Sequence, residues 1–117
     1  PAAGPEQVAG ISFIGQVIDG LDPKALRGAV DEAKQRVGAG VVALVAVNEG
    51  RASVAVGVTD GVAANAVYLV KIAVTVLGGQ GGGGRPDMAQ GGGPDGDKGA
   101  AALDAVKAAL AEATAAA

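Results

Sequence analysis

The stretch "VVALVAVNEGRASVAVGV", Val41 to Val58, decides the fold class of this chain. Its first seven residues are continuously apolar, which favours a strand that is covered on both faces. "NEGR" then supplies turn residues, and valine alternates with other residues as the chain returns through Ala52–Val58. We therefore predict an antiparallel hairpin whose first strand, Val41–Val47, lies deep inside a sheet.

The segment before this hairpin carries the signals of a helix. Asp22 suits the N-cap and Pro23 the first helical position, while Gly38 is suited to end the helix. Apolar residues recur at spacings of three and four, at Leu26, Val30, Ala33 and Val37. We predict a helix that packs this stripe on the sheet.

Further elements are predicted before and after this helix and hairpin. Residues Val8–Ile18 mix β-branched side chains with glycine, which predicts a strand that is bent or bulged at Gly15. Apolar periodicity predicts a helix over 65–77, and another from Gly99 to about Thr114 that Asp97 caps. This order of elements favours an α/β or α+β fold: a mixed, partly antiparallel sheet with packed helices.

Length and composition limit the function. The 117 residues suffice for a single domain, which we place at 8–117, with 1–7 interpreted as a linker. The chain has no Cys and no His, which excludes thiol nucleophiles, disulfides, Cys/His zinc sites and histidine acid–base catalysis. No apolar run is long enough for a membrane span. The net charge is -3, so a nucleic acid would have to be bound through shape and a few local cations.

A glycine-rich stretch, "GGQGGGGRPDMAQGGG" at Gly78–Gly93, follows the second predicted helix. It satisfies GxGxxG, but a helix precedes it and Arg85-Pro86 follows, so the context of a nucleotide-binding loop is missing. A flexible linker is the ordinary interpretation of such a run. The β-prone "MAQ" between two glycine clusters argues against a linker and predicts a short strand at Met88–Gln90. Glycines here would allow a close approach of the backbone to a bulky partner.

These residues resemble the C-terminal domain of bacterial alanyl-tRNA synthetases, in the DHH-associated domain group. The stretch Gly78–Gln90 matches that family's core Gly-Gly-x-Gly-Gly-Gly-Arg-Pro-Asp-Met-Ala-Gln nearly throughout, and upstream elements match in pattern. The chain departs from it by one additional glycine, by Gln80 where Lys is common, and by Tyr68 where an acidic residue is expected.

The resemblance implies a cytoplasmic, non-catalytic accessory domain that docks on the elbow of tRNA, with possible homodimer contacts and no cofactor or metal in this fragment. RNA is often recognised by shape, and amides of a glycine-lined surface can bind phosphates. Arg85 would contact phosphate or a base, and Lys71 would add a second cation. The candidate RNA-binding residues are thus Lys71, Gly79, Gly81, Gly82, Gly83, Gly84 and Arg85.

Structural alternatives exist for the same residues. Arg85 can instead pair with Asp87 to keep the glycine loop folded, and Met88 is expected to pack beneath it. Asp95, Asp97 and Asp104 lack the remaining ligands of a calcium loop, so metal binding is not favoured. Two other functions stay open: an oligomerisation module built on the apolar helices, and the nucleic-acid-binding accessory domain of a DHH-type phosphoesterase.

Overall fold

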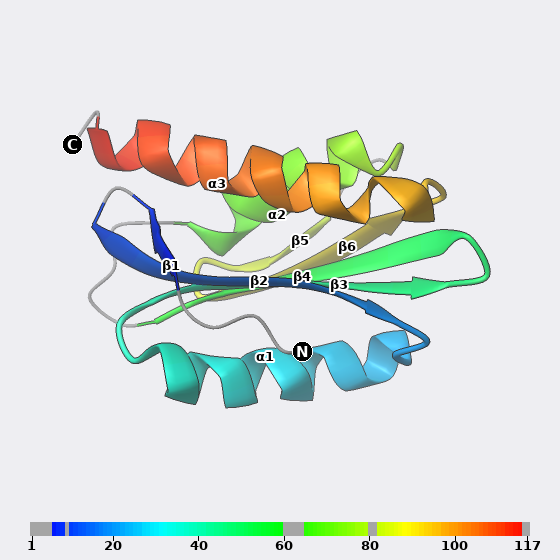
Figure 1. Cartoon of the computed structure of the whole chain (residues 1–117), viewed down its shortest axis with the longest axis horizontal. Coiled ribbons are helices and arrows are strands. Elements are labelled where there is room, and N and C mark those ends of the chain that lie inside the picture. Colours follow the sequence, from blue (N-terminus) through cyan, green and yellow to red (C-terminus); the bar gives the residue numbers. More distant parts are fainter. Residues whose placement is uncertain (1–5, 9, 60–64, 80–81, 116–117) are drawn as a thin grey trace.

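The computed structural model describes residues 6–8, 10–59, 65–79 and 82–115, which form a mixed six-stranded sheet between two layers of helices (Figure 1). The sheet has the strand order β1-β2-β3-β4-β6-β5. In chain order the elements are β1 (Glu6–Val8), β2 (Ile11–Asp19), α1 (Pro23–Val37), β3 (Gly40–Asn48), β4 (Arg51–Val58), α2 (Ala66–Val76), β5 (Gly83–Arg85), β6 (Met88–Gly93), the 3-10 helix η1 (Gly96–Lys98) and α3 (Gly99–Ala115). One face carries α1, and the opposite face carries α2 and α3.

The predicted hairpin is confirmed as the centre of this sheet. Strands β3 and β4 pair antiparallel from Val41 opposite Val58 to Asn48 opposite Arg51. Strand β3 also pairs with β2, in parallel, and α1 makes the crossover between them. The predicted caps of α1 are confirmed as well: the Asp22 carboxylate accepts a hydrogen bond from the Lys24 amide at 2.9 Å, and Gly38 ends the helix with a φ of 74°.

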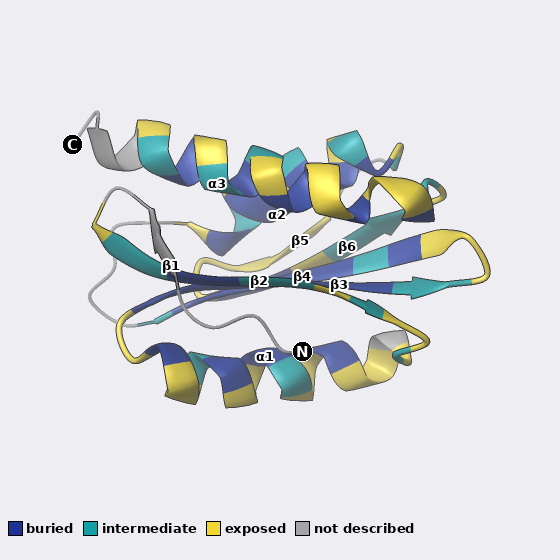
Figure 2. Ribbon diagram, viewed as in Figure 1, coloured by how far each residue is buried: buried dark blue, intermediate teal, exposed yellow. Residues whose placement is uncertain are grey.

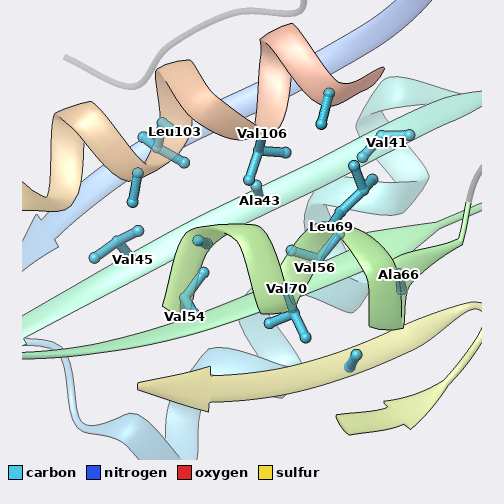
Figure 3. Close-up of a cluster of buried hydrophobic side chains, with 14 of the residues drawn as sticks. Val41, Ala43, Val45, Val54, Val56, Ala66, Leu69, Val70, Leu103 and Val106 are labelled. Carbon is cyan, nitrogen blue, oxygen red and sulfur yellow. The ribbon is translucent and has the colours of Figure 1, made fainter. Parts of the chain in front are cut away.

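Two apolar cores lie on the two faces of the sheet (Figure 2). The smaller core packs the predicted stripe of α1 against β3 and β4 and includes Met88. In the larger core, Leu69 and Val70 of α2 lie over Val54 and Val56 of β4 (Figure 3). Helix α3 contributes Leu103, Val106 and Leu110 to this core. Because valine and alanine dominate, the helices pack closely on the sheet.

Three local predictions were wrong. The single strand expected over Val8–Ile18 is divided into β1 and β2 by a turn in which Gly10 has a φ of 83°, and β1 includes residues 6 and 7. Gly15 makes no bulge, because the pairing with β3 is continuous there; its missing Cβ would lie 2.6 Å from Cε2 of Phe13 and so leaves room for that ring. Asp97 lies inside η1 rather than at the cap of α3.

Candidate nucleic-acid interface

Strands β5 and β6, Gly83–Arg85 and Met88–Gly93, form an antiparallel hairpin at one edge of the sheet, which we call the glycine ledge. The predicted strand at Met88–Gln90 is thus confirmed and extends to Gly93. Two main-chain hydrogen bonds hold the turn of the hairpin: the Ala66 amide donates to the Pro86 carbonyl at 2.8 Å, and the Val58 amide donates to the Asp87 carbonyl at 2.9 Å. The ledge is therefore part of the folded sheet and not a linker.

The glycines of the ledge allow α2 to approach the backbone directly. A Cβ at Gly91 would lie 2.4 Å from Cγ2 of Val74, and one at Gly93 would lie 2.4 Å from the carbonyl oxygen of Leu77. Real Cβ atoms do not approach other heavy atoms so closely. Both positions therefore require glycine for the packing of α2 on the ledge. At the neighbouring Gly82, a Cβ would lie 3.3 Å from the same Val74 methyl group, which is a tight contact.

Helix α1 covers the other face of the ledge only in part. It packs mainly on β3 and β4 and buries Met88 of β6, whereas Arg85 and Gln90 on the same face stay exposed. Gln90 is exposed there, and the backbone of Gly91–Gly93 is partly exposed. A hollow of about 240 Å³ runs between Leu26 of α1 and Gln90 of β6. The open surface of the glycine stretch is therefore the face beside α1.

Arg85 lies on this open side. It stands opposite Met88 in the β5–β6 register, so both side chains belong to the same face, and Met88 packs in the α1-side core. The Arg85 side chain is 68% exposed, and its Nε lies 3.8 Å from a carboxylate oxygen of Asp87. The predicted pairing with Asp87 is thus present, but it is an exposed pair that leaves the guanidinium accessible.

Lys71 lies on the other side of the sheet. Together with Tyr68 and Thr75 it forms an exposed stripe of α2, and α2 packs on the face opposite α1. The helix side that holds Lys71 also holds Val74, which contacts the ledge. A partner that touched both Lys71 and Arg85 would have to wrap around the β5 edge.

The candidate glycines differ in whether the fold already uses them or leaves them accessible to a partner. The Gly79 amide donates to the Val74 carbonyl at 2.9 Å, so it is already used inside the fold. Gly82 packs against Val74, and Gly84 has a φ of 153° with Met88 and Ala89 beneath it. Only at Gly83, among the described candidates, would a Cβ meet nothing within 4 Å. Gly81 lies outside the described residues.

Arg27 also belongs to this site, although it was not among the predicted residues. This α1 residue lines a pocket of about 150 Å³ together with Gly83, Gly84, Arg85, Met88 and Gln90. In the sequence, Arg27 is one more charged residue on the outer side of a helix, four positions before Asp31. Only the placement of α1 beside the ledge brings it near Arg85.

Comparison with known proteins places this geometry in a family. The DHHA1 domain family matches residues 10–112. The chain belongs to the DHHA1 domain family. Its fold matches the crystal structure of the C-Ala domain from Aquifex aeolicus alanyl-tRNA synthetase with a TM-score of 0.85 and 31% identity, covering 93% of this chain and 99% of that one. This DHHA1 domain is thus the counterpart of the C-terminal domain of alanyl-tRNA synthetase, as the glycine motif indicated.

Relatives of this DHHA1 domain include two alanine–tRNA ligases that are each 67% identical to it. The one from Rhizorhabdus wittichii aligns over 95% of this chain, and the one from Sphingopyxis alaskensis over 94%. The chain spans 13% of the length of either ligase. Within the described part of the DHHA1 domain, no helix combines the length and apolarity that a membrane crossing requires.

Proposed function

We propose that this DHHA1 domain is the accessory tRNA-binding domain of a cytoplasmic alanyl-tRNA synthetase, docking on the tRNA elbow to support aminoacylation and editing by separate upstream domains. The observation that carries the proposal is the glycine ledge, an ordered strand pair with a helix on one face and an open, glycine-lined face beside Arg85. Such a surface has few side chains that would keep a flat base or a bent backbone at a distance.

Electrostatics support local contacts rather than broad charge neutralisation. The net charge of -3 would repel the phosphates of a long duplex, whereas Arg85 projects on the open side of the ledge. Affinity of the isolated domain is expected to be weak, about micromolar or poorer at physiological salt. Tethering to the other domains of a synthetase would raise the effective concentration and make weak docking sufficient.

The relatives favour the synthetase over a DHH-type phosphoesterase as the parent protein, because the similar full-length proteins are alanine–tRNA ligases. The oligomerisation alternative would use the apolar helices. In the described structure their apolar faces already fill the larger core, with Leu69, Ala73 and Leu110 at most 1% exposed. RNA binding is therefore the function that the surface supports best.

The test is an NMR titration of the isotope-labelled domain with unmodified tRNA and with an RNA duplex of matched length. We expect amide shifts at Gly83, Gly84 and Gly91–Gly93 with tRNA, and weaker or absent shifts with the duplex. The Arg85→Ala variant should bind tRNA at least about tenfold more weakly, because a hydrogen bond to a charged group contributes about 1.5–3 kcal/mol. No shifts with either RNA at millimolar concentration would refute the proposed function.

A further inference from the structure

The flank of α1 that borders the glycine ledge is basic. Arg27 lines the pocket of about 150 Å³ that also includes Gly83, Gly84 and Arg85. Lys34 follows seven residues later, almost two full helical turns, and therefore lies on the same flank roughly 10 Å further along the helix axis. The side-chain stem of Lys34 crosses β4, since a Cβ at Gly57 would lie 2.9 Å from its Cδ.

The sheet register brings this flank and Arg85 together. Gly57 of β4 stands opposite Met88 of β6, and Met88 stands opposite Arg85 of β5. Lys34 and Arg85 thus lie at the same position along the strand direction. Lys34 lies over β4, and Arg85 lies on β5 at the edge of the sheet. A domain with nine Lys and Arg residues in total places three of them around this one surface.

We infer that Arg27 and Arg85 form a phosphate-binding site, in which two guanidinium groups hold one backbone phosphate of the RNA over Gly83 and Gly84. The inference rests on the proposed function and adds to it: the RNA meets the α1 side of the ledge, and α1 contributes to the contact. Guanidinium groups bind phosphate through two parallel hydrogen bonds, and glycine strands leave space for the phosphate oxygens. Lys34 lies where the neighbouring stretch of RNA backbone leaves the site.

Two carboxylates moderate the positive potential of this site. Asp87 lies 3.8 Å from Arg85, and Asp31 follows Arg27 by one helical turn. Both acids are exposed residues, so a phosphate can displace them without leaving a buried charge unpaired. The Asp87→Asn variant is accordingly expected to bind tRNA more tightly than the unmodified domain, by about twofold to threefold.

The experiment measures tRNA affinity over a series of salt concentrations for four variants of this chain: Arg27→Gln, Arg27→Lys, Arg85→Gln and the double variant Arg27→Gln/Arg85→Gln. Arg36→Gln is the matched control. It removes the same charge from the same helix, but it lies nine residues from Arg27, half a turn around the helix, and is exposed on the other flank.

We expect Arg27→Gln to weaken binding by about threefold to tenfold and to reduce the slope of log affinity against log salt by about 0.7 to 0.9. Arg36→Gln should change neither quantity, and Arg27→Lys should keep the slope while losing part of the affinity. The double variant should bind little more weakly than either single variant, because one phosphate is shared.

Two outcomes would overturn the inference and differ in what they say about the domain. If the unmodified chain binds tRNA and Arg27→Gln behaves like Arg36→Gln, the phosphate site is wrong and the proposed function stands. If the unmodified chain does not bind tRNA at any salt concentration, the proposed function is wrong and the phosphate site is wrong with it.

Discussion

Replacing Gly91 by alanine tests whether the glycine ledge is packed against α2 as described. The new Cβ would lie 2.4 Å from Cγ2 of Val74. Valine in a helix has one strongly preferred rotamer, so Val74 cannot turn this methyl group away without strain. Overpacking of this kind costs about 1–3 kcal/mol. For a domain of this size, roughly 3–6 °C of melting temperature is lost per kcal/mol.

A second substitution should restore part of the stability. Val74→Ala alone removes two buried methyl groups and should cost about 2 kcal/mol, including the cavity that remains. In the double variant, the methyl group introduced by Gly91→Ala occupies space that the valine side chain has vacated. The double variant should therefore be more stable than the sum of the single effects predicts, by about 1–2 kcal/mol.

Gly83→Ala is the matched control, because a Cβ at Gly83 meets nothing within 4 Å. Its free energy of unfolding should stay within about 0.5 kcal/mol of the original. The assay is urea denaturation followed by circular dichroism. The free energy of unfolding should depend on urea concentration with the same slope in all variants. Equal effects of Gly91→Ala and Gly83→Ala, or strictly additive effects of Gly91→Ala and Val74→Ala, would refute the packing of α2 on the ledge.

Three further predictions follow from other contacts. Asn65→Ala removes a side chain that accepts hydrogen bonds from the amides of Val67 and Tyr68 at 2.9 and 3.2 Å, so thermal unfolding should show a loss of about 1 kcal/mol. Lys71→Gln should weaken tRNA binding less than Arg85→Ala, since Lys71 lies on the helix-covered side; an equal loss in a binding assay would contradict this. Sedimentation at high concentration should show a monomer, whereas a concentration-dependent dimer would support the oligomerisation alternative.

The central part of the fold was predictable because its signals are local. The apolar run of β3, the alternation in β4 and the caps of α1 each specify one element within a few residues. The turn at Gly10 and the short strand β1 were missed, because a three-residue edge strand has no periodicity to detect. The role of Gly15 was misinterpreted because the side chain that requires a glycine there is the ring of Phe13, two residues away.

The residue types of the candidate site were predictable from the sequence. The face of the sheet on which each residue lies was not. The motif around Arg85 identified the family, and the pairing of Arg85 with Asp87 was expected from their proximity in sequence. Whether Lys71 and Arg85 face the same way depends on the order β4-β6-β5 and on which helix covers that edge. Arg27 is more than fifty residues from the ledge in sequence, and only tertiary structure brings it there.

The anchored turn of the β5–β6 hairpin has a thermodynamic consequence. Glycine loses more backbone entropy than any other residue when it becomes ordered. In this domain the carbonyl groups of Pro86 and Asp87 are tied to α2 and β4, so the ordering of β5 and β6 accompanies folding. A partner that docks on these strands therefore meets a surface with little entropy left to lose. Weak contacts suffice for such docking, and calorimetry should find a heat-capacity change set by the docked surface alone, without a contribution from coupled folding.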